Sequence, residues 1–369
     1  MQLSSHAHKL RRVWLAWIPR YERQLSAAGM LLGFATDNFM FRRVDLPNTQ
    51  IVFVVYLALA AVSILILHLI NAHSDPETER PRWQSFLPFA TQFALGGLWS
   101  GFLIFYTRSA VLLASWPFLL VLAAIFIGNE VFKRYHSRLA FTATLLFFAM
   151  FSYAMVTVPL FTHTIGAATF LLSGALAIAV FALFLYVLYL FGRTSLVASK
   201  WQIIAGAAGV YTMINLFWFI DVLPPLPVAL AKAGVFNAIR HSGDDYLGTA
   251  EPQPWYANAL ISPPIVHVQR GAPLYAYTAV FAPVRLSTRV VHAWQHYDRR
   301  AKRWVTVSTV AYAINGGRDG GYRGYTIHHD PEDGDWRVNI STDDGHPLGR
   351  IRFRVAEGAP ENLATTNLD

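Results

Sequence analysis

The stretch VVHAWQHYD places two histidines and a tryptophan at alternate positions. On a β-strand, alternate residues point to the same face about 6 to 7 Å apart, so His292, Trp294 and His296 would form one row. Histidines at this spacing can share a metal ion, with His328 or His329 as a third ligand from a neighbouring strand. No acidic residue stands where it would complete such a site. The sequence therefore predicts no metal centre and no cofactor, and Trp294 either fills the core or lines a surface groove.

Aromatic side chains around that stretch are a second candidate set, comprising Tyr275, Tyr277, Trp294, Trp304, Tyr322 and Tyr325. They would form a stacking platform for sugars such as cell-wall glycan strands, by analogy with other sandwich domains. In a domain of this size, most such aromatics simply form the core. The residues we predict for binding are His292, Trp294, His296, Trp304, Tyr322 and Tyr325.

Ionisable side chains within or beside apolar segments are the third set, because a charge inside a bilayer is costly. The four that carry this prediction are Asp37, Arg108, Glu130 and Asp221. A pair between Arg108 and Asp221 would brace two helices near the outer membrane surface. Alternatively, the four residues line a polar cavity of a transporter or of an envelope-modifying enzyme. The sequence leaves both interpretations open, and no catalytic residue is predicted.

Composition shows what kind of protein holds these residues. Of 369 residues, 54% are apolar and 14% are charged, and the mean hydropathy is positive, which indicates a membrane protein with an appended soluble domain. Without cysteine, no disulfide, thiolate metal site or cysteine nucleophile exists. The net charge of +8 comes from the first 224 residues, which hold 15 basic and 8 acidic side chains; the remainder holds 15 and 14. Basic residues in short loops between apolar runs indicate topology and argue against a nucleic-acid partner.

Several segments are long enough to cross a bilayer, which takes about 20 apolar residues. Clear ones are 51–72, 86–106, 110–128, 139–160, 165–191 and 202–222, and 25–41 is a weaker one. If there are seven spans, twelve basic residues lie on one side of the membrane and three on the other. If there are six, eight basic residues lie on one side and seven on the other. Because basic residues gather on the cytoplasmic side, we predict seven spans, a cytoplasmic N-terminus and a periplasmic C-terminal domain. Gly97 and Gly101 permit close helix packing within the bundle or between copies.

After residue 222 the pattern changes from apolar runs to short alternating segments. Prolines in LPPLPVALAKAG end the last helix. The segments that follow are PIVHVQ, LYAYTAVFA, TRVVHAWQHYD, RWVTVSTVAYAI, YRGYTIHH, DWRVNIST and GRIRFRV. Seven such strands within residues 264–355 predict an immunoglobulin-like sandwich. In the last strand Arg350, Arg352 and Arg354 would lie on the wet face, where we expect them to discourage edge-to-edge pairing.

These segments also carry a family resemblance. They are FYTRS, IGNEVFK and LPPLPVALAKAGVFN in the apolar half, and VFAPVRLSTRVVHAWQHYD, YRGYT and DWRVNISTDDGHPLGRIRFRV in the polar half. The chain resembles the bacterial family catalogued as domain of unknown function 2914, in which a multi-span membrane region often precedes a small β-domain. The resemblance implies an inner-membrane envelope protein with a periplasmic β-domain, and it implies no catalytic residues because the family has no established activity. His328 and His329 stand where that family favours a basic residue, so any role of this pair would be particular to this chain.

These patterns together predict five regions and one function. The regions are a cytoplasmic amphipathic tail (1–24), a transmembrane helical domain (25–222), a proline-rich connector (223–263), a periplasmic β-sandwich (264–358) and a disordered tail (359–369). The function is that of a polytopic inner-membrane protein presenting a non-enzymatic binding or scaffolding domain. Its expected partners are the lipid bilayer, a periplasmic protein or cell-wall glycan, and a second copy of the chain. The alternative remains a transporter or an envelope-modifying membrane enzyme.

Overall fold

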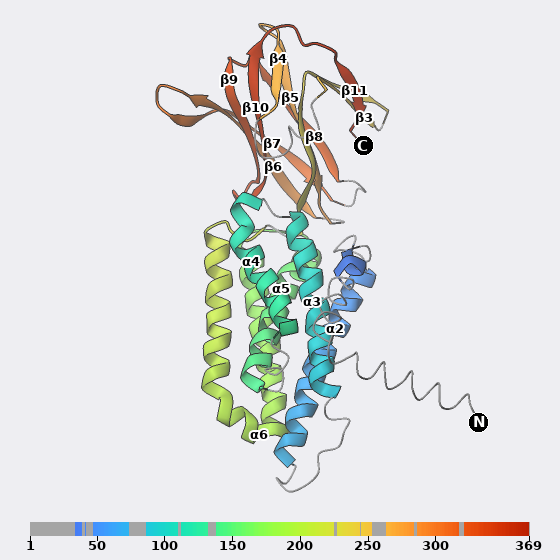
Figure 1. Cartoon of the computed structure of the whole chain (residues 1–369), viewed down its shortest axis with the longest axis vertical. Coiled ribbons are helices and arrows are strands. Elements are labelled where there is room, and N and C mark those ends of the chain that lie inside the picture. The colour runs from blue at the N-terminus through green and yellow to red at the C-terminus, as the bar shows by residue number, and fades with distance from the viewer. Residues whose placement is uncertain are drawn as a thin grey trace, which may run out of the picture. The chain divides into compact units, whose positions relative to one another are not determined.

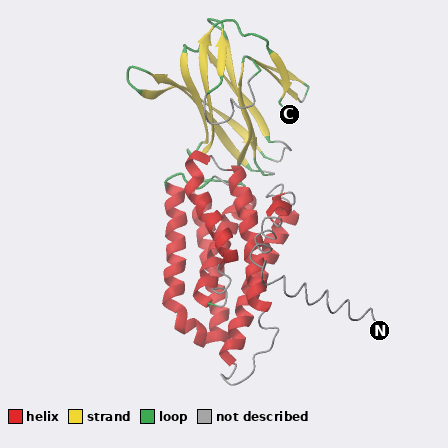
Figure 2. Cartoon of the chain, viewed as in Figure 1, coloured by secondary structure: helices red, strands yellow, loops and turns green. Residues whose placement is uncertain are grey.

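The computed structural model describes residues 34–38, 41, 47–73, 86–109, 112–131, 138–224, 227–243, 245–252, 263–283, 286–316 and 321–368. Within them, helices occupy the N-terminal part and strands the C-terminal part (Figure 1, Figure 2). The predicted division into a helical region and a β-rich region is therefore confirmed. The predicted tail 1–24 and most of the predicted first span 25–41 lie outside the described residues.

The helices with defined bounds are α2 (Pro47–His73), α3 (Phe86–Ser109), α4 (Leu112–Val131), α5 (Leu139–Thr162) and α6 (Ala167–Phe219). Four of them, α2, α3, α5 and α6, are long and apolar enough to cross a membrane, and α4 contains a shorter apolar stretch, Ser115–Asn129. Among the described residues the predicted seven spans are thus corrected to four candidate spans. Segment 25–41 lies mostly outside those residues, and the apolar stretch of α4 that the structure describes, Ser115–Asn129, is shorter than one crossing. Segments 165–191 and 202–222 both belong to α6.

The last helix is unusually long and contains a break. α6 has 53 residues, which at about 1.5 Å per residue is roughly 80 Å, more than twice the thickness of the hydrocarbon layer of a bilayer. Its backbone leaves helical angles at Gly192 (φ −132°, ψ 38°), and Figure 1 shows the ribbon bending where α6 is labelled. The loop that the sequence predicts between two spans is therefore a break at one residue.

The chain divides into two compact units. Unit 1 comprises residues 1–104, 121–150 and 180–208, and unit 2 comprises residues 105–120, 151–179 and 209–369. In unit 1, a Cβ added at Gly97 would collide with the ring of Tyr56, and one added at Gly101 would collide with the ring of Phe53. The predicted glycine pair therefore lets α3 approach α2 closely within the chain.

Strands occupy the C-terminal part of unit 2. They are β1 (Ala229–Phe236), β2 (Ala238–Ser242), β3 (Asp245–Ala250), β4 (Ile265–Val268), β5 (Pro273–Phe281), β6 (Ser287–Asp298), β7 (Arg303–Asn315), β8 (Tyr322–His329), β9 (Gly334–Thr342), β10 (Pro347–Glu357) and β11 (Ala364–Asn367). In the described residues they form three sheets, with orders β1-β5-β8, β4-β10-β9-β6-β7 and β11-β3-β2. We call these the middle sheet, the five-stranded sheet and the outer sheet.

The middle sheet is covered on both faces, because alternate residues of β5 pack in opposite directions. Leu274 joins a buried cluster with Trp294 and Trp336 of the five-stranded sheet. Tyr277 instead packs with Leu368 and with residues of the outer sheet. This alternation buries β5 almost completely, as expected for a strand between two layers.

The seven predicted strands are all present, as β4 to β10. The alternation in the last hairpin is confirmed as well, since Trp336, Val338 and Phe353 are at most 2% exposed. The finer prediction, an immunoglobulin-like sandwich, is not confirmed. The connector contributes β1, β2 and β3, the predicted disordered tail contributes β11, which pairs with β3, and β4 runs parallel to β10.

The arginines of β10 lie along a strand that is paired fully on one side and partly on the other. β9 pairs with β10 over most of its length, whereas β4 pairs with it only from Arg354 to Glu357. Among the described strands, the stretch with Arg350 and Arg352 therefore has a neighbour on the β9 side alone, and the predicted protection of an edge applies to these two arginines.

Candidate functional site

The stretch VVHAWQHYD lies in β6, and its central residues are core. His292 and Trp294 are 0% exposed. The His292 ring nitrogens Nε2 and Nδ1 lie 3.0 and 2.9 Å from the hydroxyl oxygens of Thr278 and Thr326. Trp294 donates from Nε1 to the same Thr326 oxygen over 3.0 Å. The polar atoms of both rings are thus satisfied inside the core, and neither ring is open to a ligand.

Burial also sets the protonation of this site. Desolvation lowers the pKa of His292 to about 4, so the imidazole is neutral at neutral pH, and the threonine hydroxyls can donate or accept as its tautomer requires. Tyr312, which shares a hydrogen bond with Thr278, has its pKa raised to about 12, chiefly by burial. Within the described ranges, no group of three His, Asp or Glu side chains is placed to hold a metal ion. The geometry is that of a neutral hydroxyl and imidazole network.

The remaining residues of the two sequence-predicted sets are dispersed over the fold. His296 lies near the end of β6, 4.9 Å from the ring of Trp336. Tyr322 is partly buried against a second apolar cluster, and Tyr325 lies on the middle sheet, 5.8 Å from Tyr275. Trp304 belongs to β7 of the five-stranded sheet. The structure therefore does not bring the six predicted aromatic residues onto one surface.

Of the polar set predicted for the membrane region, the structure describes the side chains of Asp37 and Asp221. Asp37 belongs to unit 1 and Asp221 to unit 2. The side chains of Arg108 and Glu130 lie outside what is described. Asp221 is 56% exposed, and its Oδ1 lies 2.9 Å from His346 Nδ1, a contact that is ionic when the imidazole is protonated. The partner that the structure provides for Asp221 is thus a histidine of the β9–β10 turn.

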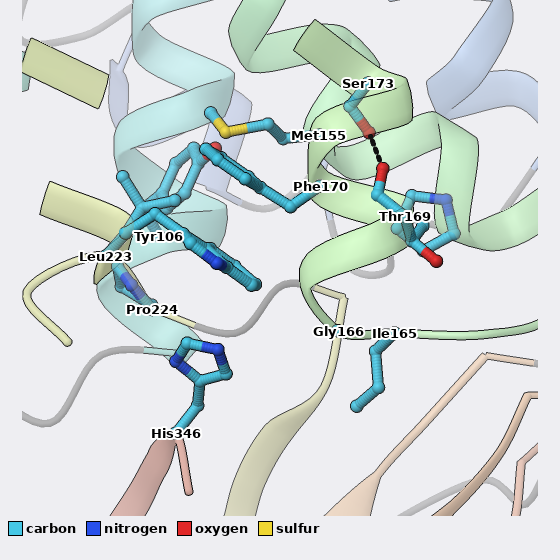
Figure 3. Close-up of a pocket in the computed structure, with 12 residues that line it drawn as sticks. Tyr106, Met155, Ile165, Gly166, Thr169, Phe170, Ser173, Leu223, Pro224 and His346 are labelled. Carbon is cyan, nitrogen blue, oxygen red and sulfur yellow. Dashed lines mark hydrogen bonds between the residues drawn. The ribbon is translucent and has the colours of Figure 1, made fainter. Parts of the chain in front are cut away.

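A small pocket within unit 2 adjoins His346 (Figure 3). The rings of Phe170 and Trp218 stack at 4.3 Å, and Trp218 lies 4.2 Å from the His346 ring. Tyr106 Oη has no hydrogen-bond partner there, and the contact of His346 Nδ1 with Asp221 is not aligned for a hydrogen bond. The space open to the centre of a water molecule is about 20 Å³, which suits roughly one water and not a substrate.

A continuous row of polar side chains crosses the exposed face of the five-stranded sheet. We call it the arginine face, and it comprises Gln295, Trp304, Thr306, Arg337, Asn339, Arg350 and Arg352. Gln295 Nε2 donates to Thr306 Oγ1 over 2.9 Å. Gln295 Oε1 accepts from Arg337 Nε over 2.6 Å and from Asn339 Nδ2 over 3.0 Å. Arg350 Nε donates to Asn339 Oδ1 over 2.6 Å, so the row links β7, β6, β9 and β10.

The charges on this face are not balanced locally. Arg352 stands directly opposite Arg337 across the β9–β10 pair, an arrangement of like charges that is ordinarily unfavourable. Partial burial, and then the nearby Arg350 and Arg352, lower the pKa of Arg337. In the part of the chain that the structure describes, the ion pair at this face is Arg354 with Asp335, at 3.1 Å, and no carboxylate pairs with the other three arginines. The described part of this face therefore carries a local excess of positive charge.

Trp304 completes the row at its β7 end. The guanidinium carbon of Arg337 lies 4.3 Å from the centre of the Trp304 ring, a distance typical of a cation over an aromatic face. Tyr297 lies 5.2 Å away, with its ring turned by 61°. The arginine and the tryptophan therefore hold each other in place beside the hydrogen-bonded row.

Residues 287–355 match the family model described as Protein of unknown function (DUF2914). The family resemblance predicted from the sequence is thereby confirmed for this segment. The DUF2914 segment runs from the start of β6 into β10, and it contains both the buried His292 and every member of the arginine face.

Other comparisons add no functional information. No curated protein matches the chain at a significant level. Among solved structures, a β-glucosidase from Listeria innocua in complex with isofagomine is similar at 10% identity, over 38% of this chain and 18% of that chain, with a TM-score of 0.18. The Pseudomonas fluorescens alkylpurine DNA glycosylase AlkC, bound to DNA containing an abasic site analog, is similar at 9% identity, over 83% and 98%, with a TM-score of 0.20. The chain spans about a fifth of the length of the first, and TM-scores this low indicate no shared fold.

Sequence reasoning found only part of the arginine face. It singled out Trp304 and noted that arginines alternate along β10, but it did not single out Gln295, Arg337 or Asn339. Their hydrogen bonds run across four strands of the DUF2914 segment. The pairing of β6 with β7 also shifts in register between Trp294 and Gln295, so a strict alternation does not predict which residues of the two strands meet. The signal that could have found them is the alternation of polar residues in DWRVNIST. Its polar residues pair across the hairpin with the arginines of GRIRFRV.

Proposed function

We propose that the chain is a multi-span inner-membrane protein that presents its β-rich region in the periplasm as a binding or scaffolding domain without enzymatic activity. The observation that carries this proposal is the arginine face. Arg337 and Arg350 are fixed by hydrogen bonds to Gln295 and Asn339. Arg337, Arg350 and Arg352 have no carboxylate partner among the described residues. Preorganised, uncompensated charge of this kind favours binding of a partner.

The proposed topology counts crossings, of which one long helix can supply two. Because α6 is about twice as long as one crossing requires, it would cross the bilayer twice, with Gly192 near the turn. α2, α3, α4 and α5 would supply four more, and segment 25–41, a span predicted from the sequence alone, would bring the total to seven. The distribution of twelve basic residues on one side and three on the other supports a cytoplasmic N-terminus and a periplasmic β-rich region.

A binding role is favoured over catalysis by the position of the reactive candidates. His292 is buried with both nitrogens occupied, so it has no access to a substrate. A transporter or envelope-modifying enzyme remains the alternative, and it would use Asp37, Arg108, Glu130 and Asp221. Its support is weaker because Asp221 already contacts His346.

The topology can be tested with single cysteines, because the chain has none of its own. We expect Thr309→Cys, at an exposed position of β7, to react with a membrane-impermeant maleimide in intact spheroplasts. Lys200→Cys, exposed on α6, should react only after permeabilisation. Labelling of both positions from the same side would contradict the proposed orientation.

The binding role can be tested with the same label. Thr309 stands opposite Ala293, which pairs in turn with Asn339 of the arginine face. Purified cell-envelope material at about ten times its dissociation constant should slow the labelling of Thr309→Cys about tenfold. Labelling of Thr366→Cys, an exposed position on β11 of the outer sheet, should not change. Equal rates for Thr309→Cys with and without the material would contradict a binding role for this face.

A further inference from the structure

We propose that the arginine face binds a linear glycan that carries carboxylate groups, with one sugar ring against Trp304. The inference rests on the proposed function and names the ligand class of the same face. Three features of the described residues lead to it: the free donors of the arginines, the spacing of the charges, and the single aromatic ring at the end of the row.

The free donors point to a planar or tetrahedral oxyanion. Arg337 and Arg350 each use Nε for an amide oxygen of the row, so the terminal nitrogens of both guanidinium groups remain available. A guanidinium group binds a carboxylate through two parallel hydrogen bonds. Because Nε is held, each fork has a fixed direction before a ligand arrives, which reduces the entropy lost on binding.

The spacing of the charges points to a polymer. Arg337 and Arg352 are direct cross-strand neighbours, with Cβ atoms about 5 Å apart, as such pairs have. Arg350 and Arg352 are alternate residues of β10, about 7 Å apart along the strand. A single small anion would occupy one or two of these forks. A glycan with a carboxylate on successive rings carries its charges at a comparable repeat and can engage all three.

The rest of the face points to sugar. Arg337 covers one face of the Trp304 ring, so the apolar side of a sugar would pack against the opposite face. The second Nε2 hydrogen of Gln295 and the hydroxyl hydrogen of Thr306 are the donors left for the hydroxyl groups of the sugar. A protein partner would favour a face with an apolar centre that loses its water on binding. The arginine face has Trp304 as its one large apolar member, so it fits a sugar polymer better than a protein. Of the exposed valines of β7, Val305 and Val310 lie opposite His296 and His292, on the inward side of the sheet, and Val307 falls in the register shift of the β6–β7 pair.

The test uses the full chain in nanodiscs of phosphatidylcholine, a lipid without net charge, and empty nanodiscs give the background binding. The probe is polygalacturonate, a linear polymer with one carboxylate per ring, and its matched control is the same polymer fully methyl-esterified. We expect binding to polygalacturonate that weakens at least about tenfold on esterification, as loss of charge-assisted hydrogen bonds requires. Arg337→Gln and Trp304→Ala should each weaken binding several-fold. Arg354→Gln should not, because Asp335 already neutralises that arginine.

Each other outcome overturns the inference in a distinct way. If inorganic polyphosphate or phosphatidylglycerol vesicles bind more tightly than polygalacturonate, with the same dependence on Arg337, the ligand is a phosphate source and the glycan class is wrong. If no probe binds while envelope material still slows the labelling of Thr309→Cys, the binding role stands and only the ligand class fails. If neither effect is seen, both proposals fail. The esterified polymer is tested against the unaltered chain, so that comparison remains decisive even where a variant folds poorly.

Discussion

Replacing Trp294 by alanine is expected to destabilise the β-rich region by about 3 to 5 kcal/mol, the usual cost of removing a large aromatic side chain from a core. Trp294 is 0% exposed and lies in the cluster between the middle and five-stranded sheets. Its loss also removes the donor to Thr326 and the ring stacked 5.3 Å from His328. Both sheets lose contacts at once, so the change should loosen them together.

Hydrogen exchange of the full chain in nanodiscs measures this effect locally. Peptides from β6 and β9 should exchange about a hundred-fold faster or more, since each 1.4 kcal/mol corresponds to a factor of about ten. Trp304→Ala is the matched control: this tryptophan lies on the exposed face of the same sheet, and its loss should change exchange there by less than about tenfold. Equal protection in the Trp294 variant and the unaltered chain would show that the ring is not part of the core.

Side-chain alternation was the most informative sequence signal for the β-rich region. A strand with one wet and one apolar face has a period of two, and this predicted Trp336, Val338 and Phe353 as core residues, all of which are buried. The same rule placed His292 and Trp294 on one face. Burial of that face explains why a histidine pair that resembles a metal site in the sequence is instead part of a neutral network.

The partners of that network were beyond sequence reasoning. Thr278 and Thr326 are 14 and 34 residues from His292, and they belong to the middle sheet, while His292 belongs to the five-stranded sheet. Nothing in a local pattern states which sheet will face which. The strands of the connector were missed for a similar reason: β2 pairs with β3, and β3 with β11, so their stability depends on a segment over a hundred residues away.

In the helical region, the sequence predicted the segments well and their connections poorly. Apolar run length identified the segments of α2, α3 and α5 closely, because the membrane imposes a minimum length on a span. It did not predict that two runs would join in one element, since FGRTSLVASK contains charged and small residues that are typical of a loop but also compatible with a helix. The polar residues of FGRTSLVASK remain helical, and the break in α6 lies at Gly192.

Acid is expected to destabilise the β-rich region through His292. Its pKa is lowered by burial from 6.5 to about 4, so the unfolded chain binds a proton at higher pH than the folded one. Stability is therefore unaffected by this group above about pH 6.5, falls as the pH drops toward 4, and then levels off. Between pH 7.5 and 5 the expected loss from His292 alone is about 2 kcal/mol, at about 1.4 kcal/mol per pKa unit.

The measurement is urea unfolding of the full chain in nanodiscs, followed by near-ultraviolet circular dichroism at both pH values. Other groups also titrate in this range, and the pKa of His328 is lowered by burial and by the neighbouring His329. The readout is therefore a difference between chains: His292→Gln, whose amide is neutral throughout, should lose about 2 kcal/mol less than the unaltered chain on acidification. His328→Gln is the matched control, because that ring is only partly buried and should account for a smaller share. If the His292→Gln and unaltered chains lose the same stability between pH 7.5 and 5, the pKa of His292 is the same in the folded and unfolded chains, and the imidazole becomes protonated inside the folded core as the pH falls. An imidazolium between Thr278 and Thr326 would require both hydroxyls to act as acceptors, and the core of the DUF2914 segment would then hold a buried charge.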